Sequence, residues 1–145
     1  MKNKMLIISD EMFLSYSYEN GNLILNNNKI LNKLDNKFEI DNISSKKINS
    51  FKASNYIKEF IKHFNYSYCI ISLNNYESIL NDALNKLKDL EIKTILISKP
   101  NASLDEINNM KELSLNNNLN YIIYDEVKKE QNANKLNSLI LNFCA

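Results

Sequence analysis

The chain alternates between short apolar runs and longer segments in which apolar residues recur every three or four positions. The short runs have the length of β-strands and lie at 4–9, 38–44, 66–73, 92–98 and 119–125. Four of them are almost continuously apolar, and only FEIDNIS at 38–44 alternates. Because a continuous apolar run suits a strand covered on both faces, the pattern predicts a parallel sheet between layers of helices.

Four further segments have the apolar spacing of amphipathic helices. They cover 50–64, 76–90, 103–115 and 133–143. Ser103 and Glu106 have the spacing of a capping box, which predicts where the third of these helices begins. The expected apolar stripes contain Ala53, Tyr56, Ile57, Phe60, Ile61 and Phe64; Ile79, Leu80, Ala83, Leu84, Leu87 and Leu90; Leu104, Ile107 and Met110; and Leu136, Leu139, Ile140 and Phe143.

The connection between the first two strands is less regular. It predicts a loop over 15–22 and then a helix that ends before residue 37, with apolar positions Ile24, Ile30, Leu31 and Leu34. Strand and helix then alternate five times, and crossover connections between parallel strands are right-handed. We therefore predict one domain over 1–145, a three-layer α/β/α sandwich whose five-stranded parallel sheet has the flavodoxin-like order 2-1-3-4-5.

The composition excludes several classes of function. The formal net charge is +1, so we expect neither nucleic acid nor a membrane surface as a partner. Gly21 is the only glycine, whereas the phosphate-binding loops of P-loop and dinucleotide-binding proteins need several. Cys69 and Cys144 are too few for a disulfide framework or a zinc cluster, and we expect no metal or other cofactor.

The length of the apolar segments also indicates where in the cell the protein is found. No stretch approaches the ~18 apolar residues that span a bilayer, and the apolar part of MKNKMLIISDE is too short for a secretory signal. We therefore expect a soluble protein of the reducing cytoplasm. The 18 basic residues are all lysines, so the chain has no guanidinium with which to hold a phosphate or carboxylate through two parallel hydrogen bonds.

A sheet of this order predicts where a ligand would bind. Its crevice lies outside the carboxyl ends of the strands, at the switch point between the first and third strands. Polar residues follow every predicted strand, although strand ends are also polar simply because they leave the core. The predicted rim of the pocket contains Ser9, Asp10, Glu11, Ser44, Ser45, Asn74, Asn75, Glu77, Lys99 and Asn101, with Asp125 and Lys128 after the last strand.

Four short motifs stand at these strand ends. They are Ser9-Asp10-Glu11-Met12, Asn42 with Ser44-Ser45, Asn74-Asn75-Tyr76-Glu77 after the run IISL, and Asp125-Glu126-Val127-Lys128. Their order along nearly the whole chain resembles that of the SGNH/GDSL hydrolases. In that family the corresponding blocks are Gly-Asp-Ser-Leu, an Asn followed by Gly and a Ser-Gly turn, Gly-x-Asn-Asp, and Asp-x-x-His.

The resemblance implies the fold more directly than the activity. Hydrolases of this type use a serine nucleophile, a histidine base and an orienting carboxylate. Here the nucleophile position holds Glu11, and the base position holds Lys128, which stays protonated near neutral pH unless it is desolvated. Tyr76 stands at one oxyanion-hole position. Only Asp10 and Asp125 match the family motifs outright.

The sole histidine does not restore the missing base. His63 lies at the end of the helix that leads into the third strand. That end of the helix is expected at the opposite edge of the sheet from the crevice. Ser9 is therefore only a weak candidate for a displaced nucleophile.

Three functions remain open at this point. The first is an SGNH-like domain without a working Ser-His-Asp triad, which binds an unknown small ligand or a partner protein. The second is an active esterase with a non-standard residue set, such as Ser9 with Asp10 or Lys128. The third is a pseudo-receiver signalling domain, suggested by the acidic pair Asp10-Glu11, although no aspartate stands at 73–75 to accept a phosphoryl group.

Overall fold

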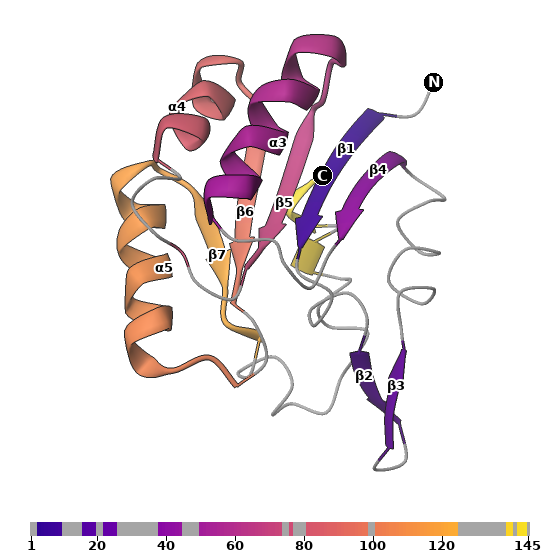
Figure 1. Cartoon of the computed structure of the whole chain (residues 1–145), viewed down its shortest axis with the longest axis vertical. Coiled ribbons are helices and arrows are strands. Elements are labelled where there is room, and N and C mark those ends of the chain that lie inside the picture. The colour runs from indigo at the N-terminus through magenta and orange to yellow at the C-terminus, as the bar shows by residue number, and fades with distance from the viewer. Residues whose placement is uncertain are drawn as a thin grey trace.

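A five-stranded parallel sheet forms the centre of the computed structural model (Figure 1). The structure describes residues 3–9, 16–19, 22–25, 38–44, 50–73, 76, 81–98, 101–124, 139–140 and 142–144. The strand order is β4-β1-β5-β6-β7, which is 2-1-3-4-5 when these five strands are numbered along the chain. The predicted sheet order is confirmed. The strand bounds are β1 Asn3–Ser9, β4 Phe38–Ser44, β5 Tyr68–Ser72, β6 Lys93–Ile97 and β7 Asn120–Ile122.

Helical residues cover both faces of this sheet. The helices α3 (Ser50–His63), α4 (Asn81–Asp89) and α5 (Leu104–Asn116) contribute to the core on one face. Helical residues at 139–140 and 142–143 contribute to the core on the other face. Alternate residues of β1 divide between the two cores, with Leu6 and Ile8 in one and Met5 and Ile7 in the other. The three-layer arrangement follows from this division.

The predicted helical stripes hold only in part, since Tyr56 in the middle of α3 and Phe64 just beyond it are 37% and 42% exposed. Ala53, Ile57, Ala83, Leu84, Leu87 and Met110 are buried, as predicted. Leu90 and Leu104 were predicted in the stripes but are 57% and 72% exposed. Leu90 lies just beyond the last residue of α4, and Leu104 is the first residue of α5, so neither has helical turns on both sides to hold it over the sheet. Ser103 caps α5 as predicted, because its side chain accepts a hydrogen bond from the Glu106 amide.

A hairpin replaces part of the predicted first connection. The strands β2 (Tyr16–Glu19) and β3 (Asn22–Leu25) pair antiparallel and form a separate two-stranded sheet. The prediction of a loop over 15–22 and of a helical position at Ile24 was therefore wrong. Alternating residues flank an Asn-Gly dipeptide at 20–21, and that sequence favours a tight hairpin turn. The other positions of that predicted helix, 30–34, lie outside the described residues.

The sheet holds a thiol at its centre. Cys69 of β5 is fully buried, and Cys144 is also buried on the other face; both are free. Burial raises the pKa of the Cys69 thiol well above its usual value. Cys69 therefore packs as a small hydrophobic residue of the core. Among the described residues, no helix is long and apolar enough to cross a membrane.

Candidate functional site

The structure describes only part of the predicted pocket. Ser9 is described in full, Ser44 through its backbone, and Asn101 as an exposed residue with a positive φ of 58°. The carboxyl ends of three parallel strands, β1, β4 and β5, form the described part of the crevice. The remaining predicted site residues lie outside the described part of the chain: Asp10, Glu11, Ser45, Asn74, Asn75, Glu77, Lys99, Asp125 and Lys128.

Three serines form one row across the carboxyl end of the sheet. Ser9 of β1 is the register partner of Ser44 in β4 and of Ser72 in β5. Register partners in parallel strands lie side by side, so the described side chains of Ser9 and Ser72 are directed to the same face. Alternation along β1 places Ser9 on the same face as Met5 and Ile7. We call these three residues the serine row; it lies at the switch point where the sequence predicts a ligand.

Two hydroxyls of the serine row are buried without a hydrogen-bond partner among the described residues. Ser9 and Ser72 are each 0% exposed, and no described residue hydrogen bonds to either Oγ. A buried hydroxyl that loses its hydrogen bonds to water and gains none in return costs about 1–3 kcal/mol. The row therefore holds two polar groups that can each donate and accept one further hydrogen bond.

Tyr76 closes the neighbouring pair of strand ends. Its hydroxyl is buried and lies 2.6 Å from the carbonyl oxygen of Ile71 in β5 and 2.9 Å from that of Ile97 in β6. The same oxygen accepts a hydrogen bond of 3.2 Å from the amide of Leu73. The phenol therefore joins the ends of two strands, and its single proton is directed to backbone carbonyls.

Ser98 has a different role from the serine row. It follows the last residue of β6, and its Oγ accepts a hydrogen bond of 2.8 Å from the backbone amide of Tyr124. The Ser98 amide in turn donates to the carbonyl of Ile122 over 3.0 Å. These two bonds join the end of β6 to the residues at the end of β7. The Ser98 hydroxyl is thus satisfied, in contrast to Ser9 and Ser72.

His63 lies at the other end of the molecule. It is the last residue of α3, its side chain is 68% exposed, and its Nε2 lies 3.9 Å from a carboxylate oxygen of Glu59. Just beyond it, the Ser67 amide donates to the carbonyl of Lys4 near the start of β1. From Lys4 to Ser9 the strand advances about 16 Å, at about 3.3 Å per residue. The structure therefore places His63 where the sequence predicts it, at the opposite edge from the crevice.

The sequence prediction missed Ser72 and Ser98, although a signal for both was present. Four of the predicted apolar runs contain the same dipeptide where the strand ends, Ile-Ser at 8–9, 43–44, 71–72 and 97–98. A hydroxyl repeated at the same position of several parallel strands is brought to one edge of the sheet. Tyr76 was placed correctly at this edge, but its contacts with the backbone could not be predicted from its position in the motif.

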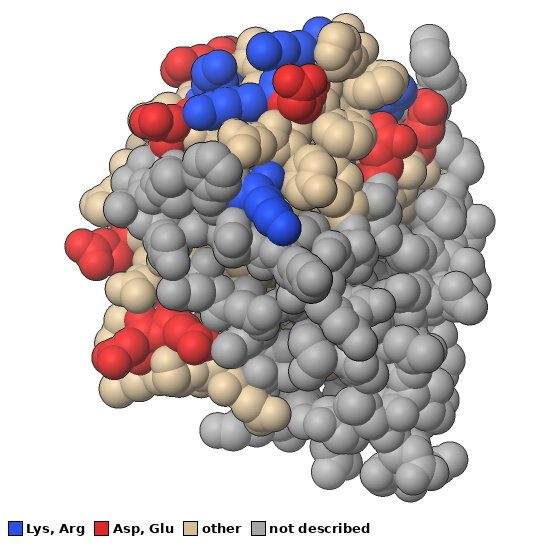
Figure 2. Space-filling model, viewed as in Figure 1, with Lys and Arg blue, Asp and Glu red and all other residues tan. Residues whose placement is uncertain are grey.

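The described part of the site is neutral. Within the described residues, no group of three or more His, Cys, Asp or Glu residues could hold a metal ion. Charged side chains of both signs are mixed over the described surface in Figure 2, most of them toward the amino ends of the strands. The serine row can therefore donate and accept hydrogen bonds, but no described cation stands beside it to neutralise an anion.

The fold is similar to that of solved esterases. The structure of the psychrotrophic esterase EstA from Pseudoalteromonas sp., inhibited by monoethylphosphonate, has a TM-score of 0.62 at 15% identity over 84% of this chain and 77% of that chain. AlinE4, an SGNH-hydrolase family esterase, has a TM-score of 0.58 at 14% identity, over 84% of this chain and 76% of that chain. No family model and no curated protein sequence matches the chain. The chain has the SGNH-hydrolase-like fold.

Proposed function

We propose that this domain is an SGNH-like pseudoenzyme, which lacks a working Ser-His-Asp triad and binds a small ligand at the serine row. One observation carries the proposal. His63 is the only histidine of the sequence, and it lies beside Glu59 at the amino end of the sheet. Ser9 lies at the carboxyl end, and β1 advances about 16 Å between the two ends. A serine hydroxyl needs an adjacent base to become a nucleophile.

Tyr76 supports the loss of chemistry independently of the histidine. An oxyanion hole needs donors that point at the position where negative charge develops. Tyr76 stands at an oxyanion-hole position of the resembling motif, but its proton is directed to the carbonyls of Ile71 and Ile97. At the oxyanion-hole position, the Tyr76 hydroxyl therefore joins two strands and does not point at a substrate.

The serine row supports binding of a neutral polar group. Ser9 and Ser72 are buried on adjacent strands without a described partner, so a ligand that donates and accepts would recover the hydrogen bonds they lack. An amide or alcohol fits these hydroxyls better than a carboxylate, because it both donates and accepts hydrogen bonds whereas an ionised carboxylate only accepts. A small molecule also fits this depth better than a folded partner protein, because both residues are 0% exposed.

A reactive phosphonate ester tests the catalytic half of the proposal without requiring the right substrate. Such a reagent forms a covalent bond to an activated serine, and EstA, which is inhibited by monoethylphosphonate, serves as the positive control. We expect the intact mass of this protein to stay unchanged under conditions that modify EstA fully. An adduct that maps to Ser9 or Ser72 would overturn the pseudoenzyme assignment, as would hydrolysis of a short-chain nitrophenyl ester that disappears in Ser9→Ala.

A titration followed by NMR tests the binding half. Butyramide and butyrate have the same alkyl chain and differ in charge at the polar end. We expect saturable shifts of the Ser9 and Ser72 amides with butyramide and much smaller ones with butyrate, and we expect Ser72→Ala to weaken the response. Equal responses to both compounds, or no response at the serine row, would contradict the proposed ligand class.

A further inference from the structure

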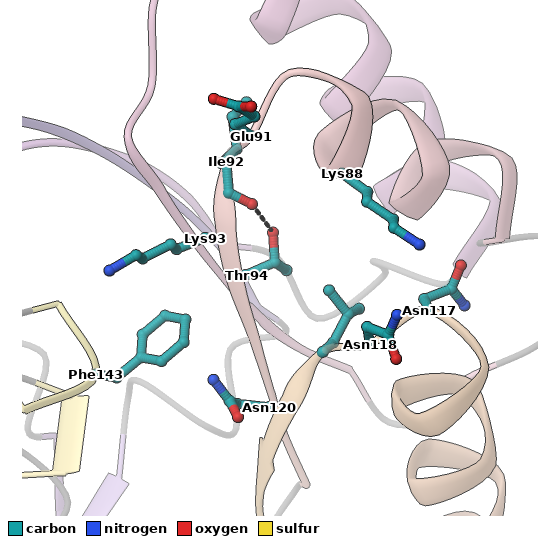
Figure 3. Close-up of a pocket in the computed structure, with 10 residues that line it drawn as sticks. Lys88, Glu91, Ile92, Lys93, Thr94, Asn117, Asn118, Asn120 and Phe143 are labelled. Atoms are coloured by element: carbon teal, nitrogen blue, oxygen red, sulfur yellow. Dashed lines mark hydrogen bonds between the residues drawn. The ribbon is translucent and has the colours of Figure 1, made fainter.

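A second concave site lies at the opposite end of the sheet from the serine row. It is a groove of about 350 Å³ between the amino ends of β6 and β7 and the carboxyl ends of α4 and α5 (Figure 3). Ligand pockets in proteins begin at about 300 Å³, so this groove can take a small molecule. Nothing in the proposed function uses it.

The groove has an apolar base and a polar rim. Ile92 and Leu119 supply apolar surface, and Phe143 adds an aromatic ring from the opposite face of the sheet. Asn118 and Asn120 contribute exposed amides at the rim. A few polar groups around apolar surface are the usual composition of a small-molecule site.

Two lysines line the groove, and their surroundings differ. Lys88 lies in the last turn of α4, where the helix carboxyl end already favours a positive charge. Lys93 is the first residue of β6, and a strand offers no comparable dipole. No described carboxylate forms an ion pair with Lys93. In Figure 3 the two side chains extend toward different ends of the groove, so the ammonium without an ion pair to a described carboxylate is at the Lys93 end.

The Lys93 end is built from three separate segments. Figure 3 shows Lys93, Asn120 and Phe143 around the same space, while Glu91 points away from Phe143. The segment that carries Phe143 is held to the sheet, because the Tyr68 hydroxyl donates to the carbonyl of the next residue, Cys144, over 2.7 Å. The ring is therefore carried by a segment that is anchored to the sheet, which reduces the entropy lost on binding.

The charge of Lys93 affects the buried thiol of Cys144, the residue that follows Phe143. Burial raises the pKa of the Cys144 thiol to about 11, and the Lys93 ammonium acts in the opposite direction. This effect agrees with Figure 3, where Lys93 and Phe143 line the same end of the groove. Both the side chains that line the groove and the effect of Lys93 on Cys144 indicate that one end of the groove is positively charged and has an aromatic wall.

We infer that the groove binds a small aromatic carboxylate, whose charged group pairs with Lys93 and the Asn120 amide and whose ring packs against Phe143. A lysine holds an anion as a point charge, which suits the compact carboxylate group. The flat body of the ligand covers the exposed part of the Phe143 ring in an offset or edge-to-face arrangement. This site is independent of the proposed function, because it lies at the other end of every strand.

Benzoate is the probe for this inference, and benzamide is its neutral counterpart. In a titration of the ¹⁵N-labelled chain at constant ionic strength, we expect saturable shifts with benzoate at Lys93, Thr94, Asn120 and Phe143. Lys93→Gln should weaken benzoate binding about tenfold, which corresponds to about 1.4 kcal/mol. Lys62→Gln is the matched control, since Lys62 is an exposed lysine of α3 away from the groove.

Each outcome of this experiment decides the inference. Loss of benzoate binding in Lys93→Gln alone, with the rest of the spectrum unchanged, supports it. Benzamide that binds as tightly as benzoate would overturn the role of charge, and an equal loss in Lys62→Gln would show a non-specific ionic effect. For such a small ligand we expect a dissociation constant of about 1 mM. Shifts that do not saturate by about 10 mM benzoate would therefore overturn the site. None of these results depends on the serine row.

Discussion

The hydroxyl of Tyr66 donates a hydrogen bond to the carboxylate of Asp41 over 2.5 Å. Tyr66 lies just before β5, whereas Asp41 is in β4, on the far side of β1. The bond therefore fastens an edge strand to a segment that is not its neighbour in the sheet. A salt bridge of 3.8 Å between Lys4 of β1 and Glu39 of β4 supports the same edge.

Removing this hydroxyl should loosen the edge of the sheet. Tyr66→Phe leaves the half-buried Asp41 carboxylate without this donor, so we expect the free energy of unfolding to fall by about 1–2 kcal/mol. Urea titration followed by circular dichroism measures the change. Tyr56→Phe is the control, because Tyr56 is 37% exposed on α3 and should change stability little. Equal effects of the two substitutions would contradict a specific role for the Tyr66–Asp41 bond.

The same pair makes a prediction about alkaline pH. Burial, followed by the bond to Asp41, raises the pKa of Tyr66 above its ordinary value of 10.0. The folded state thus favours the protonated phenol, and this contribution is complete below about pH 10, the pKa in the unfolded chain. As the pH rises above 10 it is lost progressively. We expect the unfolding free energy of the native protein to decline more steeply above pH 10 than that of Tyr66→Phe; parallel curves would contradict this.

Ser72 and Ser98 should respond in opposite directions to the same substitution. Ser72→Ala removes a buried hydroxyl without a described partner, so we expect the unliganded protein to gain about 0.5–1 kcal/mol of stability. Ser98→Ala removes the acceptor of the Tyr124 amide and should cost about 1 kcal/mol. Thermal unfolding of both variants makes the comparison. A loss of stability in Ser72→Ala would mean that the hydroxyl is already paired.

Tyr76→Phe should be among the more damaging removals of a single hydroxyl in the described structure. It leaves the buried Leu73 amide without its acceptor and two carbonyls without their shared donor. We expect a loss of about 1–3 kcal/mol in unfolding free energy. Hydrogen exchange at the ends of β5 and β6 should increase as well, because the phenol joins these two strands. Unchanged exchange there would show that the contact does not hold the strands together.

Glu91 offers a stabilising change. It follows α4 with a positive φ of 58°, a conformation that costs a residue with a side chain about 1–2 kcal/mol and costs glycine little. Glu91→Gly should therefore raise the unfolding free energy by about 0.5–1 kcal/mol. Asn85→Gly inside α4 is the matched control and should lower it, because glycine is unfavourable in a helix interior. A decrease with Glu91→Gly would mean that the Glu91 side chain makes a contact that outweighs the backbone strain.

The sheet could be predicted from the sequence because its strands are buried on both faces. A run such as Met5–Ile8 has apolar side chains on alternate faces, and nothing but a covered central strand accommodates them. The hairpin of β2 and β3 differs from the predicted loop and helix because the turn preference of the Asn-Gly dipeptide outweighs the spacing of a few apolar residues. The exposure of Leu90 and Leu104 depends on where each helix ends, which the apolar spacing does not fix.

The candidate site was less predictable than the sheet. Polar residues follow every predicted strand, and the sequence alone does not show which of these side chains lie close together in the folded protein. The serine row arises from the register of three strands, and register is a property of pairs of strands and not of any one sequence segment. The role of Tyr76 depends on carbonyl groups from two different strands, whose positions are set by tertiary structure.

The burial of Cys69 gives the protein an intrinsic reporter of its own motions. Its thiol lies in the core on one face of β5, and burial keeps it protonated, so a thiol reagent reaches it only when that core opens. Cys144 is 7% exposed, lies in the core on the other face of the sheet, and offers a second rate for comparison. The ratio of the two labelling rates would separate local fraying from global opening without any introduced label.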